Sequence, residues 1–364
     1  MEPETVHKND LDSSSKPIRI VPDANVLFAD PFFQSVAART ILSATQFMDI
    51  GIVIGEITLD EVRNIVNEQL RTIVKDLGKV TNKAKALNLE TGINLYNLGY
   101  HLKQASQAWE KRWEALKKGS TSMSYPVIDP REIALRSITE HRPFLKGDKG
   151  FRDYLLWISI LAALPTDNCR YILVSNDNGF YAENSAQLHS DLEKELASLG
   201  LAGRVLVRKS FLDVIDEFIK PRLKPDQAVE LAIKSGKIPD FTDANDEVDI
   251  LINEYLMTID IPEEWITTYD YYAASFDVAE DVVMTDLVST FELDDKVLAT
   301  SEWEAAVAIE VSAHGYRHEW ETAIVRFKVE SIIDPQTLEV ESHEVRGYEL
   351  LGWYDQKNKE MIPY

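Results

Sequence analysis

The stretch Ile18-Arg19-Ile20-Val21-Pro22-Asp23 decides the fold that this sequence predicts. Its β-branched aliphatic residues indicate a buried strand, and an aspartate follows directly where the strand ends. Tyr171-Ile172-Leu173-Val174 repeats the pattern and is followed two residues later by Asp177. Because ligands of parallel α/β sheets bind beyond the carboxyl ends of the strands, both aspartates are predicted to lie at one ligand-binding edge.

Helical patterns alternate with the predicted strands, which favours a three-layer α/β/α fold with a central parallel sheet. Thr58-Leu59-Asp60-Glu61 has the spacing of a capping box and predicts that a helix begins at Thr58. The remaining elements expected here are strands at 50–54 and 204–207, helical segments from Thr58 to about Lys118 and from about Pro130, and helices over 151–164 and 184–199.

Four carboxylates fall where this sheet would bring them together: Asp23, Glu61, Asp153 and Asp177. Clustered acids repel one another unless they are protonated or neutralised by a cation. Hard oxygen ligands of this kind suit Mg²⁺ or Mn²⁺, so the sequence predicts a divalent-metal site. Such an ion binds a phosphate oxygen and assists displacement at phosphorus.

Each acid also has a purely structural interpretation. Glu61 occupies the position of a capping box that hydrogen-bonds locally, and Asp153 sits where an acid favours a helix N-terminus. Asp177 lies in Ser-Asn-Asp-Asn-Gly, which is typical of a turn. The sequence alone leaves these interpretations open beside the metal site.

The motifs and their order resemble those of the PIN domain, a nuclease fold. Asp23-Ala24-Asn25 resembles the opening Asp-x-Asn motif, and the stretch from Ile54 to Val62 resembles the family's strand-to-helix segment with its second acid. Gly150-Phe151-Arg152-Asp153 resembles the segment with the third acid, particularly in a bacterial subfamily with a long helical insertion. Val174 to Phe180 resembles the closing Thr-x-Asp-x-Asp-Phe motif, and the resemblance covers about residues 17–220.

The resemblance implies an endoribonuclease that hydrolyses RNA phosphodiester bonds with Mg²⁺ or Mn²⁺ and leaves 5′-phosphate and 3′-hydroxyl ends. It implies that Asp23, Glu61, Asp153 and Asp177 are catalytic metal ligands, supported through hydrogen bonds by Asn25 and Ser175. One departure is Gly179, which stands where the family has a second Asp in its last motif.

Gly179 and the acidic C-terminal part keep open a PIN scaffold or binding protein with weak or lost activity. A structure-specific nuclease that acts on DNA would use the same metals and is a further alternative. A phosphatase of the haloacid-dehalogenase type is disfavoured because that chemistry needs an acid where Asn25 stands.

Basic residues flank the third acid. Lys146, Lys149 and Arg152 are expected to hold phosphates of RNA, or of single-stranded DNA, although an ordinary solvated loop has the same pattern. Trp109 and Trp113, one helical turn apart, are expected in the core rather than as base-stacking platforms.

Charge is distributed unevenly along the chain of 364 residues. Residues 225–364 hold 32 Asp and Glu against 9 Lys and Arg, a net charge of −23, and residues 1–224 are neutral. The acidic part is expected to bind a basic protein or to self-associate. The expected organisation is a flexible tail (1–16), a PIN-like nuclease domain (17–224) with a helical insertion at about 76–145, a linker (225–249) and an acidic, β-rich α+β domain (250–364).

No stretch has the roughly 18 uninterrupted apolar residues that a membrane helix needs, so no membrane association is expected. The single cysteine, Cys169, cannot form an internal disulfide and is expected in the core. These features favour a cytoplasmic protein.

Overall fold

Two units with separate cores make up the chain in a computed structural model. The structure describes residues 16–86, 95–125, 127–146, 149–182, 185–242, 246–262, 271–313, 317–355 and 360–363. The first unit spans residues 1–34 and 45–217, and the second spans 35–44 and 218–364. The predicted tail lies outside the described residues, apart from Lys16.

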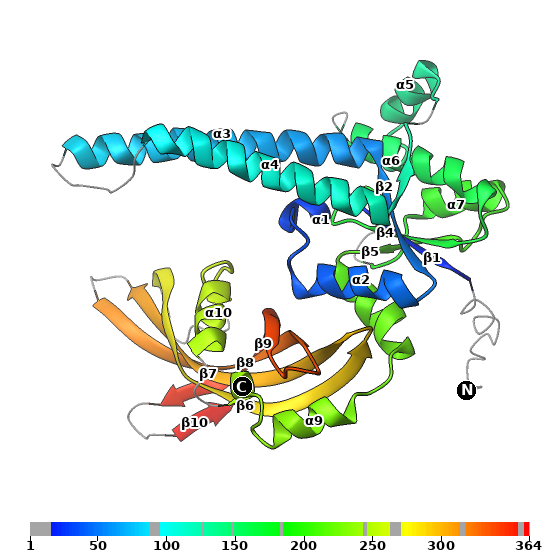
Figure 1. Ribbon diagram of the computed structural model, residues 1–364. Helices are drawn as coiled ribbons and strands as arrows, with labels where there is room; N and C mark the ends of the chain where they lie inside the picture. The colour runs from blue at the N-terminus through cyan, green and yellow to red at the C-terminus, as the bar shows by residue number, and fades with distance from the viewer. Residues whose placement is uncertain are drawn as a thin grey trace, which may run out of the picture. The chain divides into compact units, whose positions relative to one another are not determined.

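The first unit is built on a five-stranded sheet in the order β3-β2-β1-β4-β5, with every neighbouring pair parallel (Figure 1). This confirms the predicted fold class. The central strand β1 pairs with β4 in a register that sets Pro22 opposite Val174, so the two strands end side by side. The strands are β1 (Ile18–Pro22), β2 (Ile50–Gly55), β3 (Thr121–Met123), β4 (Arg170–Val174) and β5 (Val205–Arg208).

Both faces of the sheet are buried, which is why its strands are almost continuously apolar. On one face, Val21 and Leu173 pack with Trp157 of α6 (Phe151–Ala163) and Leu192 of α7 (Ser190–Ser198) in one core. Residues of the opposite parity, such as Ile20, are fully buried on the other face. Cys169 belongs to this core as a buried free thiol, as expected.

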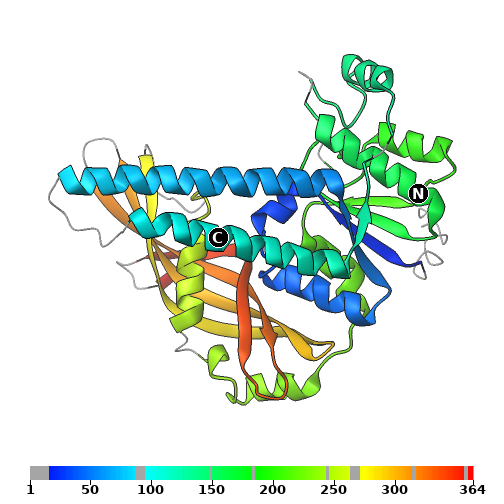
Figure 2. The ribbon, with the colours of Figure 1, turned by 45° about the horizontal axis from the view of Figure 1, so that its top comes forward.

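Two long helices, α3 (Glu56–Ala86) and α4 (Leu95–Gly119), run side by side in both ribbon views (Figures 1 and 2). The predicted capping box at Thr58 is wrong, because α3 already begins at Glu56 and the Thr58 hydroxyl is buried inside the helix without a hydrogen-bond partner. The other helices of this unit are α1 (Ala24–Ala29), α5 (Pro130–Ile138), α6 (Phe151–Ala163), α7 (Ser190–Ser198) and α8 (Phe211–Val214), with a π-helical turn over Ile215–Ile219.

The helix predicted over 184–199 is shorter than expected. It begins at Ser190, because the His189 ring accepts a hydrogen bond from the Asp191 amide and caps the helix there. Leu188 is held in a bridge to Tyr181 instead. Asn184 lies outside the described residues.

The second unit is an antiparallel β half-barrel in which consecutive strands are neighbours, in the order β10-β9-β8-β7-β6. The predicted strand-rich C-terminal region is therefore confirmed. The strands are β6 (Tyr271–Leu293), β7 (Lys296–Ala313), β8 (Arg317–Ile333), β9 (Val340–Asp355) and β10 (Glu360–Pro363).

Helices pack on this sheet, and some come from the stretch expected to be a linker. Val229 of α9 (Gln227–Lys234) and Ile252 of α10 (Asp246–Leu256) are buried in one core with Trp303 and Phe327 of the sheet. The structure thus describes folded segments within residues 225–249.

Most of α2 (Val36–Phe47) also belongs to the second unit. Arg39 forms an ion pair of 2.6 Å with Glu341 and donates a hydrogen bond of 3.2 Å to the Ser342 hydroxyl. The Ala37 amide donates to the Glu344 carboxylate at 3.2 Å. None of the helices that the structure describes combines the length and apolar character of a membrane span.

Candidate metal centre

Asp23 and Ser175 meet where β1 and β4 end. The Asp23 amide donates to the Val174 carbonyl at 2.8 Å, which extends the strand pairing by one residue. The Ser175 hydroxyl donates to Oδ2 of Asp23 at 2.6 Å, and the Ala24 amide donates to Oδ1 at 2.6 Å. Both side chains are buried, so the Asp23 carboxylate has a fixed orientation.

Ser175 also positions the loop of Asp177. Its hydroxyl oxygen accepts a hydrogen bond of 3.0 Å from the Asp177 amide, and Oδ1 of Asp177 accepts one of 2.6 Å from the Gly179 amide. Asp177 therefore does form the turn that its sequence suggested. Because the turn engages Oδ1, the second carboxylate oxygen, Oδ2, can serve another role.

Helices deliver the other two acids. Asp153 lies in the first turn of α6, and Glu61 lies in the second turn of α3. Glu61 forms an ion pair with Arg152, whose side chain is 62% exposed. Because α3 begins at Glu56, the local capping role that the sequence left open for Glu61 is not formed.

The four acids influence one another electrostatically, which shows that the fold brings them together. Burial, followed by the charges of Asp177, Asp23 and Glu61, raises the pKa of Asp153 to about 7. Burial also raises the pKa of Asp23, against hydrogen bonds from Ser175 and Ala24 that lower it. The pKa of Glu61 is raised by burial, while the Arg152 charge lowers it.

These residues fit a divalent cation by the chemistry of their donors. Carboxylates that hold one another's pKa values high in a partly buried site are stabilised by an added positive charge. Within the part of the chain that the structure describes, no three of these four carboxylates have oxygens that all lie within 4.8 Å of one another. Such spacing suits an ion that keeps several water ligands, as Mg²⁺ does.

Gly179 is explained by the loop opposite it. A Cβ at this position would lie 2.7 Å from the carbonyl oxygen of Pro143 and 3.0 Å from Oδ1 of Asp177. Gly150, at φ +97°, meets the same carbonyl, at 2.4 Å from its Cβ position. The Pro143 carbonyl thus packs between the two glycines, and an acid at position 179 does not fit this backbone.

Of the predicted phosphate-binding residues, Arg152 contacts an acid of the site, Glu61, and the two lysines lie in the segment that precedes α6. Leu145 and Lys149 close a short turn, in which the Leu145 amide donates to the Lys149 carbonyl at 2.8 Å. The side chains of Lys146 and Lys149 are exposed, and so is Asn25 on α1. Gly147 and Asp148 lie outside the described residues.

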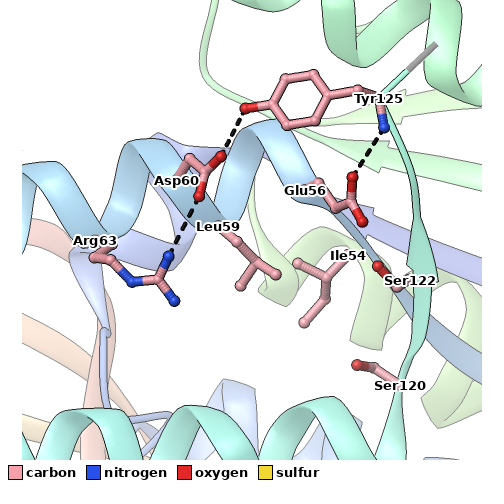
Figure 3. Close-up of a pocket in the computed structure, with 8 residues that line it drawn as sticks. All are labelled: Ile54, Glu56, Leu59, Asp60, Arg63, Ser120, Ser122 and Tyr125. Carbon is pink, nitrogen blue, oxygen red and sulfur yellow. Dashed lines mark hydrogen bonds and ion pairs between the residues drawn. The ribbon is translucent and has the colours of Figure 1, made fainter.

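Sequence reasoning missed a pocket of about 410 Å³ near the start of α3 (Figure 3). Tyr125 closes its rim: its amide donates to Glu56 at 3.1 Å and its hydroxyl donates to Asp60 at 2.8 Å. Arg63 donates to the same Asp60 at 3.3 Å. The pocket contains none of the four acids, and its own carboxylates are bound by protein donors. Its lining residues are Ile54, Glu56, Leu59, Asp60, Arg63, Ser120, Ser122 and Tyr125.

Trp109 and Trp113 are buried at 4% and 1% exposure, as predicted for core residues. Trp113 packs edge-on against Phe33, with ring centroids 6.3 Å apart. They cannot stack on bases in this arrangement.

Comparison with known proteins agrees with the fold and with the motif order. Residues 20–180 match the family model of the PIN domain, and this family consists largely of nucleases that typically use divalent metals. Neither the curated proteins nor the solved structures gave a match to the chain. The matched segment begins in β1 and ends just past Asp177, so it contains all four acids. Residues 20–180 of this chain are a PIN domain.

Proposed function

We propose that this protein is a divalent-metal-dependent endoribonuclease, with Asp23, Glu61, Asp153 and Asp177 as its metal ligands. The observation that carries the proposal is the convergence of these acids from four separate elements: burial raises the pKa of Asp23, Glu61 and Asp153, and the charges of neighbouring acids of the set raise them further. Isolated carboxylates that serve only as caps or turn formers would not need to converge.

Each residue has a distinct task in this proposal. Ser175 holds Asp23 through one hydrogen bond and the Asp177 amide through another, so it sets the distance between two ligands. Lys146 and Lys149, both exposed, attract the phosphates of the RNA strand. When bound, the metal would supply charge stabilisation at the phosphate and a lower pKa for the attacking water.

Besides its predicted contact with RNA phosphates, Arg152 has a task when no metal is bound. Its guanidinium lies beside Glu61 and lowers the pKa values of Asp23, Glu61 and Asp153. We infer that it partly neutralises the acids until a cation or substrate arrives. Because it is exposed, it can turn toward a phosphate at little cost.

The direct test incubates the full chain with single-stranded RNA and Mn²⁺ or Mg²⁺, with EDTA in a parallel reaction. Cleavage that needs the metal and leaves 5′-phosphate ends is expected. The Asp23→Asn variant is expected to lose at least 100-fold in rate, as for loss of a metal ligand, while it keeps the fold by circular dichroism. Undiminished cleavage by the Asp23→Asn variant would contradict the assignment of Asp23 as a metal ligand of the nuclease.

Asp60→Asn provides a matched control on the same helix as Glu61. Asp60 precedes Glu61 by one position but faces the pocket of Figure 3, where it pairs with Tyr125 and Arg63. Glu61→Gln is expected to reduce metal-dependent cleavage strongly, whereas Asp60→Asn leaves the metal site intact. The same reactions with single-stranded DNA and with branched DNA separate an RNase from a structure-specific DNA nuclease.

A second candidate is a PIN scaffold that binds RNA but does not cleave it. The Arg152–Glu61 ion pair favours this candidate, because the Arg152 guanidinium already neutralises one of the four acids. Gly179, in place of the family's further acid, points the same way. In that case RNA binds with no metal-dependent cleavage. The acidic residues 225–364 are then the natural site for a basic protein partner or for self-association.

A further inference from the structure

Three side chains outside the PIN domain converge in the second unit. Asp240 lies in the 3-10 turn η5 (Pro239–Phe241), Glu247 in the first turn of α10, and His343 on β9. One oxygen of each carboxylate and one ring nitrogen of the histidine all lie within 4.8 Å of one another. Among the described residues, no other group of three or more His, Cys, Asp or Glu side chains has ligand atoms this close together.

The His343 ring leaves one nitrogen for this cluster. Its Nδ1 lies 2.7 Å from the hydroxyl oxygen of Ser331, the residue paired with it across β8 and β9. Its Nε2 is buried and has no hydrogen-bond partner. A buried polar atom without a partner is costly, so this nitrogen indicates a missing ligand rather than a packed ring.

The orientation of the ring is fixed from two sides. Ser331 is fully buried, and Phe241 packs edge-on against the imidazole with ring centroids 5.9 Å apart. Metal-binding histidines generally have their second nitrogen hydrogen-bonded in this way, which sets the tautomer and the direction of the first. If Nδ1–H donates to Ser331, then Nε2 carries a lone pair that can bind a cation.

We propose that Asp240, Glu247 and His343 bind one Zn²⁺ ion. One imidazole with carboxylate oxygens is a donor set that suits Zn²⁺, whereas Mg²⁺ and Ca²⁺ prefer oxygen alone. Ligands about 2.1 Å from a tetrahedral ion lie about 3.4 Å apart, so donors within 4.8 Å need to close by at most about 1.4 Å. Glu247 is exposed and can make that movement, and its exposure leaves a position for water.

The site would fasten a helix to the sheet. α10 packs into the core through Val248, Ile252 and Leu256, while its first turn carries Glu247 outside that core. A bound ion would join this turn, η5 and β9, and would therefore stabilise the folded second unit by an amount that grows with the logarithm of the free ion concentration.

The test measures Zn²⁺ binding to the metal-stripped full chain by calorimetry, with thermal unfolding as a second readout. The acids of the PIN domain also attract Zn²⁺, so the comparison is between variants. Asp23→Asn is expected to retain the site, and His343→Gln is expected to bind one Zn²⁺ fewer per chain. Glu247→Gln, an exposed change that should not disturb folding, is expected to weaken that site at least 10-fold.

Thermal unfolding separates the proposal from a fold defect. Zn²⁺ is expected to raise the melting temperature of the wild type and of Asp23→Asn more than that of His343→Gln and Glu247→Gln. Mg²⁺ at the same concentration is expected to produce no difference among His343→Gln, Glu247→Gln and the wild type. Equal Zn²⁺ stoichiometry and equal affinity in the wild type and Glu247→Gln would overturn the assignment.

Discussion

Burial and the charges of neighbouring acids raise the pKa of Asp153 to about 7, close to neutral pH. An unfolded chain would release this proton near pH 4, so between about pH 4 and 7 the folded state binds more protons than the unfolded state. In that window the stability of the metal-free protein falls as pH rises. The contribution of the neutral acid is present at the low end and lost at the high end.

We expect Asp153→Asn to remove this slope. This pH dependence is measured by urea unfolding in EDTA between pH 4.5 and 7.5, which gives the difference in unfolding free energy between the wild type and the variant at each pH. The unfolding free energy of the variant is expected to increase relative to that of the wild type as pH rises, because the asparagine in the variant carries no charge to repel Asp23 and Asp177. A difference that stays constant with pH would contradict the raised pKa.

Mn²⁺ should reverse the trend in the wild type. The ion binds the deprotonated acids, so its stabilising effect is expected to grow from pH 5.5 to pH 8. A metal effect that is equal at both pH values would argue against ligation by Asp153.

Ser175 is the residue whose single hydroxyl joins two acids. Ser175→Ala removes a hydrogen bond to the Asp23 carboxylate and leaves the Asp177 amide without its acceptor. We expect a loss of about 1–3 kcal/mol in unfolding free energy. We also expect a roughly 10–100-fold loss in Mn²⁺ affinity, as for other groups that orient metal ligands.

Ser198→Ala is the control for this variant, because that hydroxyl bonds only a helix carbonyl and is exposed. Calorimetric titration with Mn²⁺ compares the two. If Ser175→Ala binds Mn²⁺ as tightly as Ser198→Ala, then Ser175 does not position the ligands.

The positions of Asp23, Asp153 and Asp177 were predictable at this scale because each follows a strand end or opens a helix, where backbone topology alone places a side chain. The metal-binding role of the four acids stays a prediction. The Arg152–Glu61 pair and the high pKa of Asp153 were not predictable. Both depend on how deeply each carboxylate is buried and on distances between elements, which a one-dimensional pattern does not contain.

At the scale of elements, the loop through Pro143 fixes the spacing between two segments of the metal centre. Its carbonyl meets Gly150, just before α6, and Gly179, just after Asp177. No sequence motif marks this contact, since it is formed by a backbone atom 36 residues away from one of its partners. The family's missing acid at position 179 was visible in the sequence, but its physical reason was not.

Gly179→Ala is expected to destabilise the protein by about 1–3 kcal/mol, because the new methyl group meets backbone that cannot move aside freely. Gly78→Ala is the matched control. Gly78 lies inside α3, and a methyl group added there would have nothing within 4 Å, so the change is expected to stabilise by about 0.5–1 kcal/mol. Equal effects of the two changes on urea unfolding would contradict the close contact at Gly179.

The start of α3 shows where a local signal misled. Thr58 and Glu61 have the spacing of a cap, yet the helix begins two residues earlier at Glu56, directly after β2. Tertiary burial of Thr58 outweighed its local preference for a cap. Elements with strong apolar runs, such as β1, β4 and α6, were predicted nearly to the residue because burial itself specifies them.

At the scale of the whole molecule, the two units differ sharply in net charge. Each of them is built from two separate stretches of the chain. The division near residue 220 was predictable from composition, since almost all of the net negative charge lies beyond it. The assignment of residues 35–44 to the second unit was not predictable, because it rests on contacts with residues some 300 positions later. The His343 cluster escaped notice for the same reason.

A fragment of residues 218–364 is therefore expected to be less stable than the same unit in the full chain. It lacks Arg39 and the Ala37 amide, which pair with Glu341 and Glu344 of β9. Thermal unfolding followed by tryptophan fluorescence compares the fragment with the full chain. A fragment that melts at the temperature of the intact unit would show that residues 35–44 are dispensable for it.

The path of the chain through α2 carries a consequence for how such proteins can diverge. The polypeptide passes from one unit to the other after residues 34, 44 and 217, so neither unit corresponds to one uninterrupted stretch of coding sequence. A recombination that copied only the C-terminal portion into another protein would leave part of its packing behind. We therefore expect the two units to be inherited together, and sequence change in residues 35–44 to be constrained by the packing of the second unit.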